Sequence, residues 1–341
     1  MTEAVKQNEL FIKISELIKT ARCKTLKTVN QKMVHTYFQI GKMIIEDEQK
    51  GNKRAEYGKY ILKNLSKRLS EEFGKGFSVQ NLENMRKFYL IYSESEKSQT
   101  PFRIFENNDS TLSWSHYQIL VRIENQEERD FYLIEAQKNN WSVRELKRQF
   151  DSALYERLAL SRDKQGIKEL SEKGQLIEKP ADAKKDPYIL EFLGLPEHHH
   201  YSESVFEQEI INKLQHFLLE LGKGFTFVCR QVRLTFDEKH FRVDLVFYNR
   251  LLKCFVLIDL KIGELTHQDI GQMQMYVNYH DRYVKLPEEN KTIGIILCKD
   301  KNQSLVEITL PESNDQIFAS RYKTVLPDKK TLIEILNQSE I

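Results

Sequence analysis

Long apolar runs are missing from this 341-residue sequence, and none approaches the roughly 20 residues that a helix needs to span a bilayer. The first ten residues are polar and lack the apolar centre of a secretory signal. The four cysteines form no CxxC pair, so neither a structural zinc site nor a disulfide framework is expected. These absences predict a cytoplasmic protein with no membrane partner.

A large excess of one charge is missing as well, because 52 Lys and Arg face 50 Asp and Glu, for a net charge of +2. The charges are unevenly placed, since the first 100 residues hold 19 basic against 12 acidic side chains. Such a local excess could contact phosphates, or it could be an ordinary solvated helical surface. A hydrophobic content of 40% predicts a globular protein with a real core.

The first half of the chain repeats apolar residues at helical spacing. Ser78, Ser113 and Ser142 stand where N-caps are expected. A charged stretch that is poor in apolar residues follows at 161–187, and we interpret it as a linker or exposed arm. The first half therefore predicts an all-α N-terminal domain over residues 1–160, with helices at 10–49, 60–73, 79–92, 113–123, 127–140 and 143–160.

The second half, residues 188–341, has a different pattern. A helical run at 204–222 precedes three strand-like runs at 225–236, 241–249 and 254–262. A helix at 267–284 and strands at 293–298 and 305–310 complete the pattern. This order predicts an α/β domain in which helices cover one central sheet.

The strand over 254–262 carries the most informative residues, Asp259 and Lys261. Side chains alternate along a strand, so both share a face with the apolar Phe255 and Leu257. A charge beside such neighbours needs a partner or a metal ion. Asp244 is likewise isolated in the apolar strand before it, and a hairpin turn at 249–253 can bring it near Asp259.

Two carboxylates and an ammonium group would then converge, which suits phosphodiester hydrolysis. Asp244 and Asp259 can hold Mg²⁺, with Mn²⁺ as a substitute, while Lys261 orients the attacking water or stabilises the phosphorane. A carboxylate on the preceding helix commonly completes such a site, and Glu207 is the candidate, with Glu209 its rival. The alternative is a salt bridge of Asp244 or Asp259 with Lys261 or Arg242, without catalysis.

The helix at 267–284 places Gln268, Gln272 and Tyr276 four residues apart on one face. They could line the site, and Gln272 is the one included among the catalytic candidates; a polar face of a half-buried helix is the alternative. The run His198–His200 invites a metal interpretation, but consecutive histidines point in different directions. A polar loop is favoured there.

Long segments of both halves resemble the YhcG family of proteins with a C-terminal PD-(D/E)XK nuclease domain. The resemblance is carried by YGKYILKNLSKRLSEEFGKGFSVQNLENMRKFY and NNWSVRELKRQFDSALYERL upstream, and by FRVDLVFYNRLLKCFVLIDLKIGEL downstream. It implies a restriction-endonuclease-like fold and places the family motif on Glu207, Asp244, Asp259 and Lys261. The usual glutamate of the E-x-K motif is an aspartate here, Asp259, whose shorter side chain moves the metal ligand and can change the metal preference.

The N-terminal domain is expected to bind DNA or a protein partner. In GKGFSVQNLENMRKFY, a turn precedes a helix that resembles a recognition helix. Its basic residues would meet phosphates and its amides would reach base edges. Trp114, His116, Tyr117 and Trp141 are expected to pack in the core. The candidate phosphate contacts are Lys75, Arg86 and Lys87, and the candidate base readers are Gln80, Asn81 and Asn84.

Together these features predict a Mg²⁺-dependent endonuclease of DNA, which would form a homodimer if it cuts both strands. A catalytically silent nucleic-acid-binding or scaffold protein on the same fold is the alternative. An RNA-directed nuclease ranks last, because no aromatic sheet motif for single-stranded RNA is visible. The sequence does not select a DNA structure, a recognition sequence or a pathway.

Overall fold

The computed structural model describes residues 3–50, 55–93, 112–160, 164–195, 201–236, 239–326, 328–330 and 332–333. The chain forms two compact units, Met1–Lys147 and Arg148–Ile341, each described here by itself. Among the described residues, no helix is both long and apolar enough to cross a membrane. His198–His200 lie outside the described residues.

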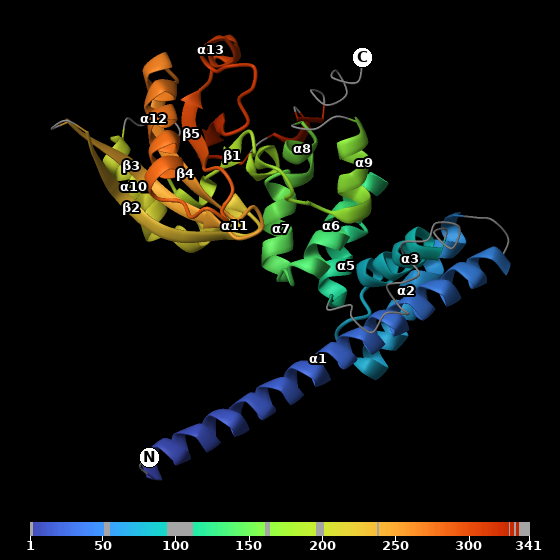
Figure 1. Cartoon of the computed structure of the whole chain (residues 1–341). Helices are drawn as coiled ribbons and strands as arrows, with labels where there is room; N and C mark the ends of the chain where they lie inside the picture. The colour runs from blue at the N-terminus through green and yellow to red at the C-terminus, as the bar shows by residue number, and fades with distance from the viewer. Residues whose placement is uncertain are drawn as a thin grey trace. The chain divides into compact units, whose positions relative to one another are not determined.

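The N-terminal unit is helical where it is described, as predicted (Figure 1). Ser78 caps the third helix by accepting a hydrogen bond from Asn81 N at 3.3 Å, and Ser142 accepts one from Glu145 N at 3.2 Å. The last helix of the unit, α7, continues across the boundary into the second unit. The helices are α1 (Glu3–Lys50), α2 (Ala55–Phe73), α3 (Val79–Ser93), α5 (Trp114–Leu120), α6 (Gln126–Lys138) and α7 (Val143–Asp151).

Apolar side chains of α1, α2 and α3 form the core of this unit around Leu82 and Met85, both fully buried. Gly41 of α1 lies against the Met85 carbonyl, and an added Cβ there would collide with that backbone. The close approach of α1 to α3 therefore requires a glycine. Trp114 packs beside Phe88 with ring centroids 5.4 Å apart, which places this tryptophan in the core as expected.

Two of the three amides expected to read base edges lie inside the N-terminal unit, whereas Gln80 is exposed. Asn84 is only 3% exposed. Asn81 Oδ1 accepts hydrogen bonds from Trp114 Nε1 at 2.8 Å and Gln118 Nε2 at 2.6 Å, and its Nδ2 donates to the Gly76 carbonyl. The expectation that Asn81 and Asn84 face DNA is therefore wrong, because Asn84 is buried and the Asn81 side chain is hydrogen-bonded to its neighbours.

The second unit is built on a mixed six-stranded sheet in the order β1-β6-β5-β4-β3-β2. β2, β3 and β4 are antiparallel neighbours, and β4, β5, β6 and β1 run parallel. The β3–β4 hairpin pairs Asn249 with Cys254, as predicted. The strands are β1 (Tyr188–Ile189), β2 (Phe225–Phe236), β3 (Lys239–Asn249), β4 (Cys254–Glu264), β5 (Ile293–Asp300) and β6 (Ile317–Lys323).

Helices cover both faces of this sheet (Figure 1). On one face, α10 (Glu203–Asn212) and α11 (Leu214–Leu221) bury Phe206 and Phe217 against β3 and β4. On the other, α12 (His267–Tyr283) buries Met273 and Tyr276. The predicted α/β, restriction-endonuclease-like arrangement is confirmed.

Two predicted elements of this unit differ in the structure. Of residues 305–310, predicted as a strand, 305–309 belong to the helix α13 (Gln303–Thr309), because Asn302 Oδ1 accepts a hydrogen bond from Leu305 N at 3.2 Å and begins a helix. The helix predicted over 204–222 is broken at Lys213, whose φ of −117° separates α10 from α11.

The segment 161–187, expected to be a linker, differs as well. Its described part holds the helix α9 (Lys164–Lys173) and the short 3-10 helix Pro180–Ala183. It also buries Ala183 and Lys185, each at 2% exposure. The segment is packed despite its few apolar residues, because some of the side chains that it buries are polar.

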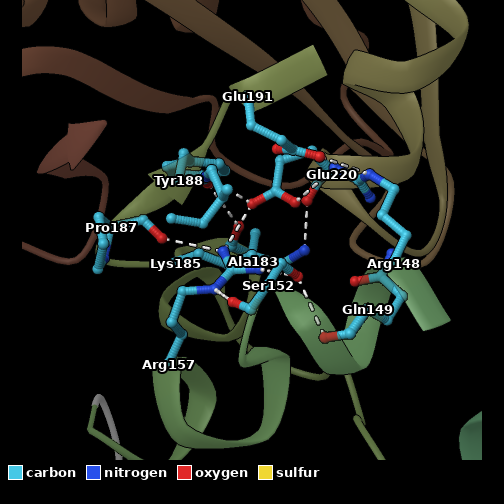
Figure 2. Close-up of polar contacts among 11 residues, drawn as sticks. Arg148, Gln149, Ser152, Arg157, Ala183, Lys185, Pro187, Tyr188, Glu191 and Glu220 are labelled. Carbon is cyan, nitrogen blue, oxygen red and sulfur yellow. Dashed lines mark hydrogen bonds and ion pairs between the residues drawn. The ribbon is translucent and has the colours of Figure 1, made fainter. Parts of the chain in front are cut away.

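That buried polar contact centres on Glu220 of α11 (Figure 2). Glu220 Oε1 accepts hydrogen bonds from Arg157 Nη1 at 2.6 Å and from Ile189 N at 3.0 Å. Arg148 Nη2 lies 3.4 Å from Glu220 Oε2, and Lys185 donates to the Glu220 carbonyl. Burial alone would raise the pKa of Glu220, but the surrounding cations lower it to about 2. The group fastens α7, α8 (Leu154–Ala159) and β1 to α11, which covers the six-stranded sheet.

Candidate active site

The candidate site lies where β3 separates from β4. Their pairing ends at Leu245 opposite Ile258. One residue further on, the Asp244 Oδ2 atom accepts a hydrogen bond from Leu260 N at 2.8 Å. The Asp244 carboxylate thus takes the place of a β3 backbone acceptor for this β4 amide, next to Asp259, as the hairpin prediction required.

A residue that was not predicted, Gln231 of β2, lies at the centre of the site. Its Nε2 donates to Asp244 Oδ1 at 3.0 Å and to Glu207 Oε2 at 2.7 Å. The backbone of Gln231 has a φ of 50°, in the left-handed region that a non-glycine residue seldom adopts. This irregularity interrupts the β2–β3 ladder between the pairs Arg230–Leu245 and Val232–Val243. An unusual backbone conformation therefore aims the amide at two carboxylates.

Glu207, rather than Glu209, reaches this site from α10. Glu207 is 8% exposed, and its Oε1 atom is buried without a hydrogen-bond partner. Glu209 is half-buried and lies 3.9 Å from Lys213, one helical turn away. Ser202 caps α10 by accepting a hydrogen bond from Val205 N at 3.3 Å, so the helix begins just before the turn that carries Glu207.

Lys261 supplies the cation of the site. Its Nζ lies 3.1 Å from Asp259 Oδ2 and 3.7 Å from Asp269 Oδ1. Asp269 was not predicted as a site residue, and the capping pattern that starts at Thr266 is its only signal in the sequence. Burial would lower the pKa of Lys261, but the carboxylate of Asp259 outweighs it and raises that pKa above its usual value. The ammonium therefore stays charged at neutral pH.

The acids of the site are held close together in a poorly solvated place. Burial, followed by the negative charge of Asp244, raises the pKa of Asp259 to about 7, although Lys261 opposes that rise. Burial and Asp244 also raise the pKa of Glu207. Neighbouring carboxylates that disfavour one another in this way gain free energy when a cation joins them.

The helix α12 contributes to the site indirectly. Gln272 donates to the Tyr276 hydroxyl, and that hydroxyl donates to the Arg242 carbonyl of β3 at 2.7 Å. Burial raises the pKa of Tyr276, the hydrogen bond from Gln272 opposes that rise, and the negative charges of Asp259 and Asp244 add to it. Gln268 is exposed. Of the three residues predicted to share this face, Gln272 and Tyr276 are joined to each other and, through the Arg242 carbonyl, to β3.

The donor set suits a hard divalent ion, because oxygen ligands are what Mg²⁺ and Mn²⁺ prefer. The unpartnered Glu207 Oε1 atom also fits such a group. Within the described part of the chain, however, no three acids, histidines or cysteines are already gathered tightly enough to enclose an ion. The Gln231 amide between Glu207 and Asp244 is one physical reason.

Comparisons with known proteins cover nearly the whole chain. Residues 181–337 match the family described as "YhcG PDDEXK nuclease domain", and residues 13–157 match the "DUF1016 N-terminal domain". The chain is 40% identical over 349 residues to "Putative nuclease YhcG" of Escherichia coli (strain K12), spanning 96% of this chain and 92% of that protein.

Among solved structures, a repair endonuclease from Pyrococcus abyssi is matched at 15% identity. The match covers 38% of this chain and 50% of that one, with a TM-score of 0.26. A likeness this slight carries no inference about the site.

Proposed function

We propose, from the premise that this chain belongs to the YhcG family of proteins with a PDDEXK nuclease domain, that it is a divalent-metal-dependent endonuclease of DNA. The observation that carries the proposal is the meeting of Glu207, Asp244, Asp259 and Lys261 at the end of β4. Three acids and one ammonium from three different elements are joined there by hydrogen bonds and an ion pair.

The metal ligands in this proposal are Asp244 and Asp259, with Glu207 as a supporting carboxylate. Their oxygens fit Mg²⁺ or Mn²⁺ in type, and the buried Glu207 Oε1 atom has a free lone pair for such an ion. A divalent ion held there would act as a Lewis acid and neutralise charge on the phosphate. Gln231 has to turn its amide aside when the carboxylates close on an ion, because its Nε2 now lies between two of them.

Lys261 is the residue that acts on the phosphate and the attacking water. Its Nζ forms an ion pair with Asp259 Oδ2 at 3.1 Å, and the side chain is 18% exposed, so it is both held and accessible. A fixed positive charge at that position stabilises the negative charge that develops on the phosphate oxygens. Tyr276 and Gln272 position the Arg242 end of β3, through the hydroxyl bond to the Arg242 carbonyl.

The first prediction is that Asp244→Asn and Lys261→Met each reduce Mn²⁺-dependent cleavage of duplex DNA by about a hundredfold or more, as loss of one charge-stabilising group does. Asparagine keeps an acceptor for Leu260 N, so the strand contact survives while the charge is lost. Methionine keeps the length of the lysine side chain. Cleavage is measured on purified full-length protein, and circular dichroism checks the fold.

Asp315→Asn and Lys291→Met form the matched control, because these residues make an exposed acid–lysine pair 3.6 Å apart on the same unit. They should leave cleavage unchanged. Full activity of both site variants would remove these residues from the mechanism. No cleavage of duplex, single-stranded or branched DNA by the wild type would favour the catalytically silent alternative.

A further inference from the structure

Beyond the candidate site, β2 and β3 continue as a two-stranded ribbon. Pairing of β3 with β4 begins only at Leu245, whereas β2 and β3 stay paired as far as Phe236 opposite Lys239. Residues 239–244 of β3 therefore have a strand partner on one side only. Figure 1 shows the two strands as a long pair at the edge of the sheet. The ribbon starts at Gln231 and Asp244, so it is continuous with the site.

The two faces of the ribbon differ in chemistry. One face carries Leu234, Phe241 and Val243, which pack into the core beneath α12. Residues paired directly across two strands point to the same side, as do residues two apart on one strand. The other face therefore carries Arg233, Thr235, His240 and Arg242, and all four are exposed. We call these four residues the polar ribbon face.

Two arginines are placed directly opposite one another on this face, Arg233 on β2 and Arg242 on β3. Like charges in that position destabilise a strand pair. The ion pairs found among the described residues give neither arginine an acidic partner. Fold stability therefore does not explain the pair, whereas a ligand with negative charge does.

The guanidinium of Arg233 is held in place rather than left free to turn. Arg233 Nη2 lies 2.6 Å from His240 Nε2, and His240 Nδ1 lies 3.0 Å from Thr235 Oγ1. Arginine can only donate, so Nε2 accepts, and Nδ1 carries the proton that is donated to Thr235. Fixing an arginine in advance lowers the entropy cost of binding a phosphate.

We infer that the polar ribbon face binds the phosphate backbone of the DNA that enters the candidate site. Arg242 is two residues from Asp244, and Arg233 is two residues from Gln231, so the arginines lie next to the carboxylates along both strands. Phosphates neutralise the repulsion between the arginines, and guanidinium groups are the side chains best suited to them. This inference rests on the proposed function for its substrate, but its test does not depend on cleavage.

The decisive variant is Arg242→Glu in the full-length protein. It places a negative charge opposite Arg233, where the wild type has two positive charges facing each other. The melting temperature of the protein should therefore stay the same or rise. DNA affinity should nevertheless fall about tenfold or more, and the slope of log K against log salt should shrink by roughly one to two, as expected when one phosphate contact is lost and an acid is added. Binding is measured by fluorescence anisotropy on a labelled duplex in EDTA, which prevents cleavage.

Arg250→Ala with Lys253→Ala is the control for Arg233→Ala with Arg242→Ala. Both double variants remove two exposed positive charges, but Arg250 and Lys253 lie in the turn at the opposite end of β3. Only the double variant Arg233→Ala with Arg242→Ala should bind DNA more weakly than the wild type. The inference would be overturned by equal losses of DNA affinity in both double variants, by wild-type affinity in Arg242→Glu, or by a wild type that does not bind DNA. A loss of affinity that is seen only with RNA duplexes would also overturn it.

Hydrolysis of bis(p-nitrophenyl) phosphate with Mn²⁺ separates this inference from the proposed function. This small diester reaches the candidate site without needing the ribbon, so Arg233→Ala with Arg242→Ala should hydrolyse it like the wild type. If the wild type cleaves neither this diester nor DNA, yet its DNA binding requires the two arginines, then the proposed hydrolysis fails and the ribbon inference stands.

Discussion

Gln231 is an uncharged residue that hydrogen-bonds two acids of the candidate site. Its Nε2 atom has two N–H donors and donates to both Glu207 and Asp244, two acids that repel one another. A neutral amide offsets only part of that repulsion, whereas a divalent cation offsets much more. The same residue thus stabilises the site without an ion and must move when one binds.

At this scale we expect Gln231→Ala to lower the unfolding free energy of the metal-free protein by about 1 to 3 kcal/mol, the cost of leaving buried acceptors unpaired. Saturating Mn²⁺ should recover most of that loss, because an ion takes over the role of the amide. Melting temperatures of wild type and variant, each in EDTA and in Mn²⁺, measure both quantities. An equal loss under both conditions would make Gln231 a purely structural residue.

The sequence predicted that Asp244, Asp259 and Lys261 would converge because strand alternation and hairpin pairing are local rules, whereas Glu207 was chosen over Glu209 through the family resemblance. It could not predict Gln231, since a polar residue in an exposed edge strand is ordinary and its left-handed backbone depends on the neighbouring strand. The prediction that Asn81 and Asn84 read base edges was wrong for a related reason. Helical spacing gives the direction of a side chain, but only the packed neighbours decide whether it faces solvent.

At the scale of elements, short segments were the hardest to predict. Residues 305–310 alternate like a strand, yet the Asn302 cap makes them helical, and strand β6 was not predicted at all. β1 has only two residues and exists because Tyr188 pairs with Tyr322 and Glu220 accepts the Ile189 amide. Such elements are set by distant contacts that a local pattern does not contain.

The ion group at Glu220 leads to a prediction about pH. Its pKa is depressed from 4.5 to about 2, so the folded state binds fewer protons than the unfolded state between those values. The contribution, about 3 kcal/mol, is complete above pH 4.5 and is lost as the pH falls toward 2. Chemical unfolding of Arg148–Ile341 followed across that range should show this loss.

Glu220→Gln should remove the Glu220 share of that pH dependence and destabilise the second unit by about 3 to 5 kcal/mol at pH 7, because Arg157 is left buried and unpaired. Glu209→Gln is the control. Its ion pair with Lys213 is 3.9 Å long and partly exposed, so the change should cost under about 1 kcal/mol. Equal effects of the two substitutions would contradict a special role for the buried group.

At the scale of the whole molecule, the family matches and the packing divide the chain differently. The N-terminal match extends to residue 157 and the nuclease match begins at 181, but the second compact unit begins at Arg148. Arg148 and Arg157 both contact Glu220 of the nuclease-type unit. Residues near this boundary therefore match the N-terminal family in sequence but pack within the second compact unit.

We accordingly expect a fragment of residues 142–341 to unfold cooperatively, with the Ser142 cap and α7 intact. A fragment of residues 181–341 should be several kcal/mol less stable or fail to fold, because Glu220 loses its Arg148 and Arg157 partners together with the helices that carry them. Thermal melts and hydrogen exchange compare the two. The same melting temperature in both fragments would show that α7 and α8 are dispensable.

The long edge strand β2 also affects how copies of the chain can meet. An exposed edge offers unpaired backbone groups to any other strand, and charged side chains and irregular pairing oppose such addition. β2 has both, with Arg230 and Arg233 exposed, a register shift after Phe227 and the left-handed turn at Gln231. Two copies of this protein should therefore not join their sheets through β2, and sheet-to-sheet aggregation from that side is disfavoured by the same residues that shape the site.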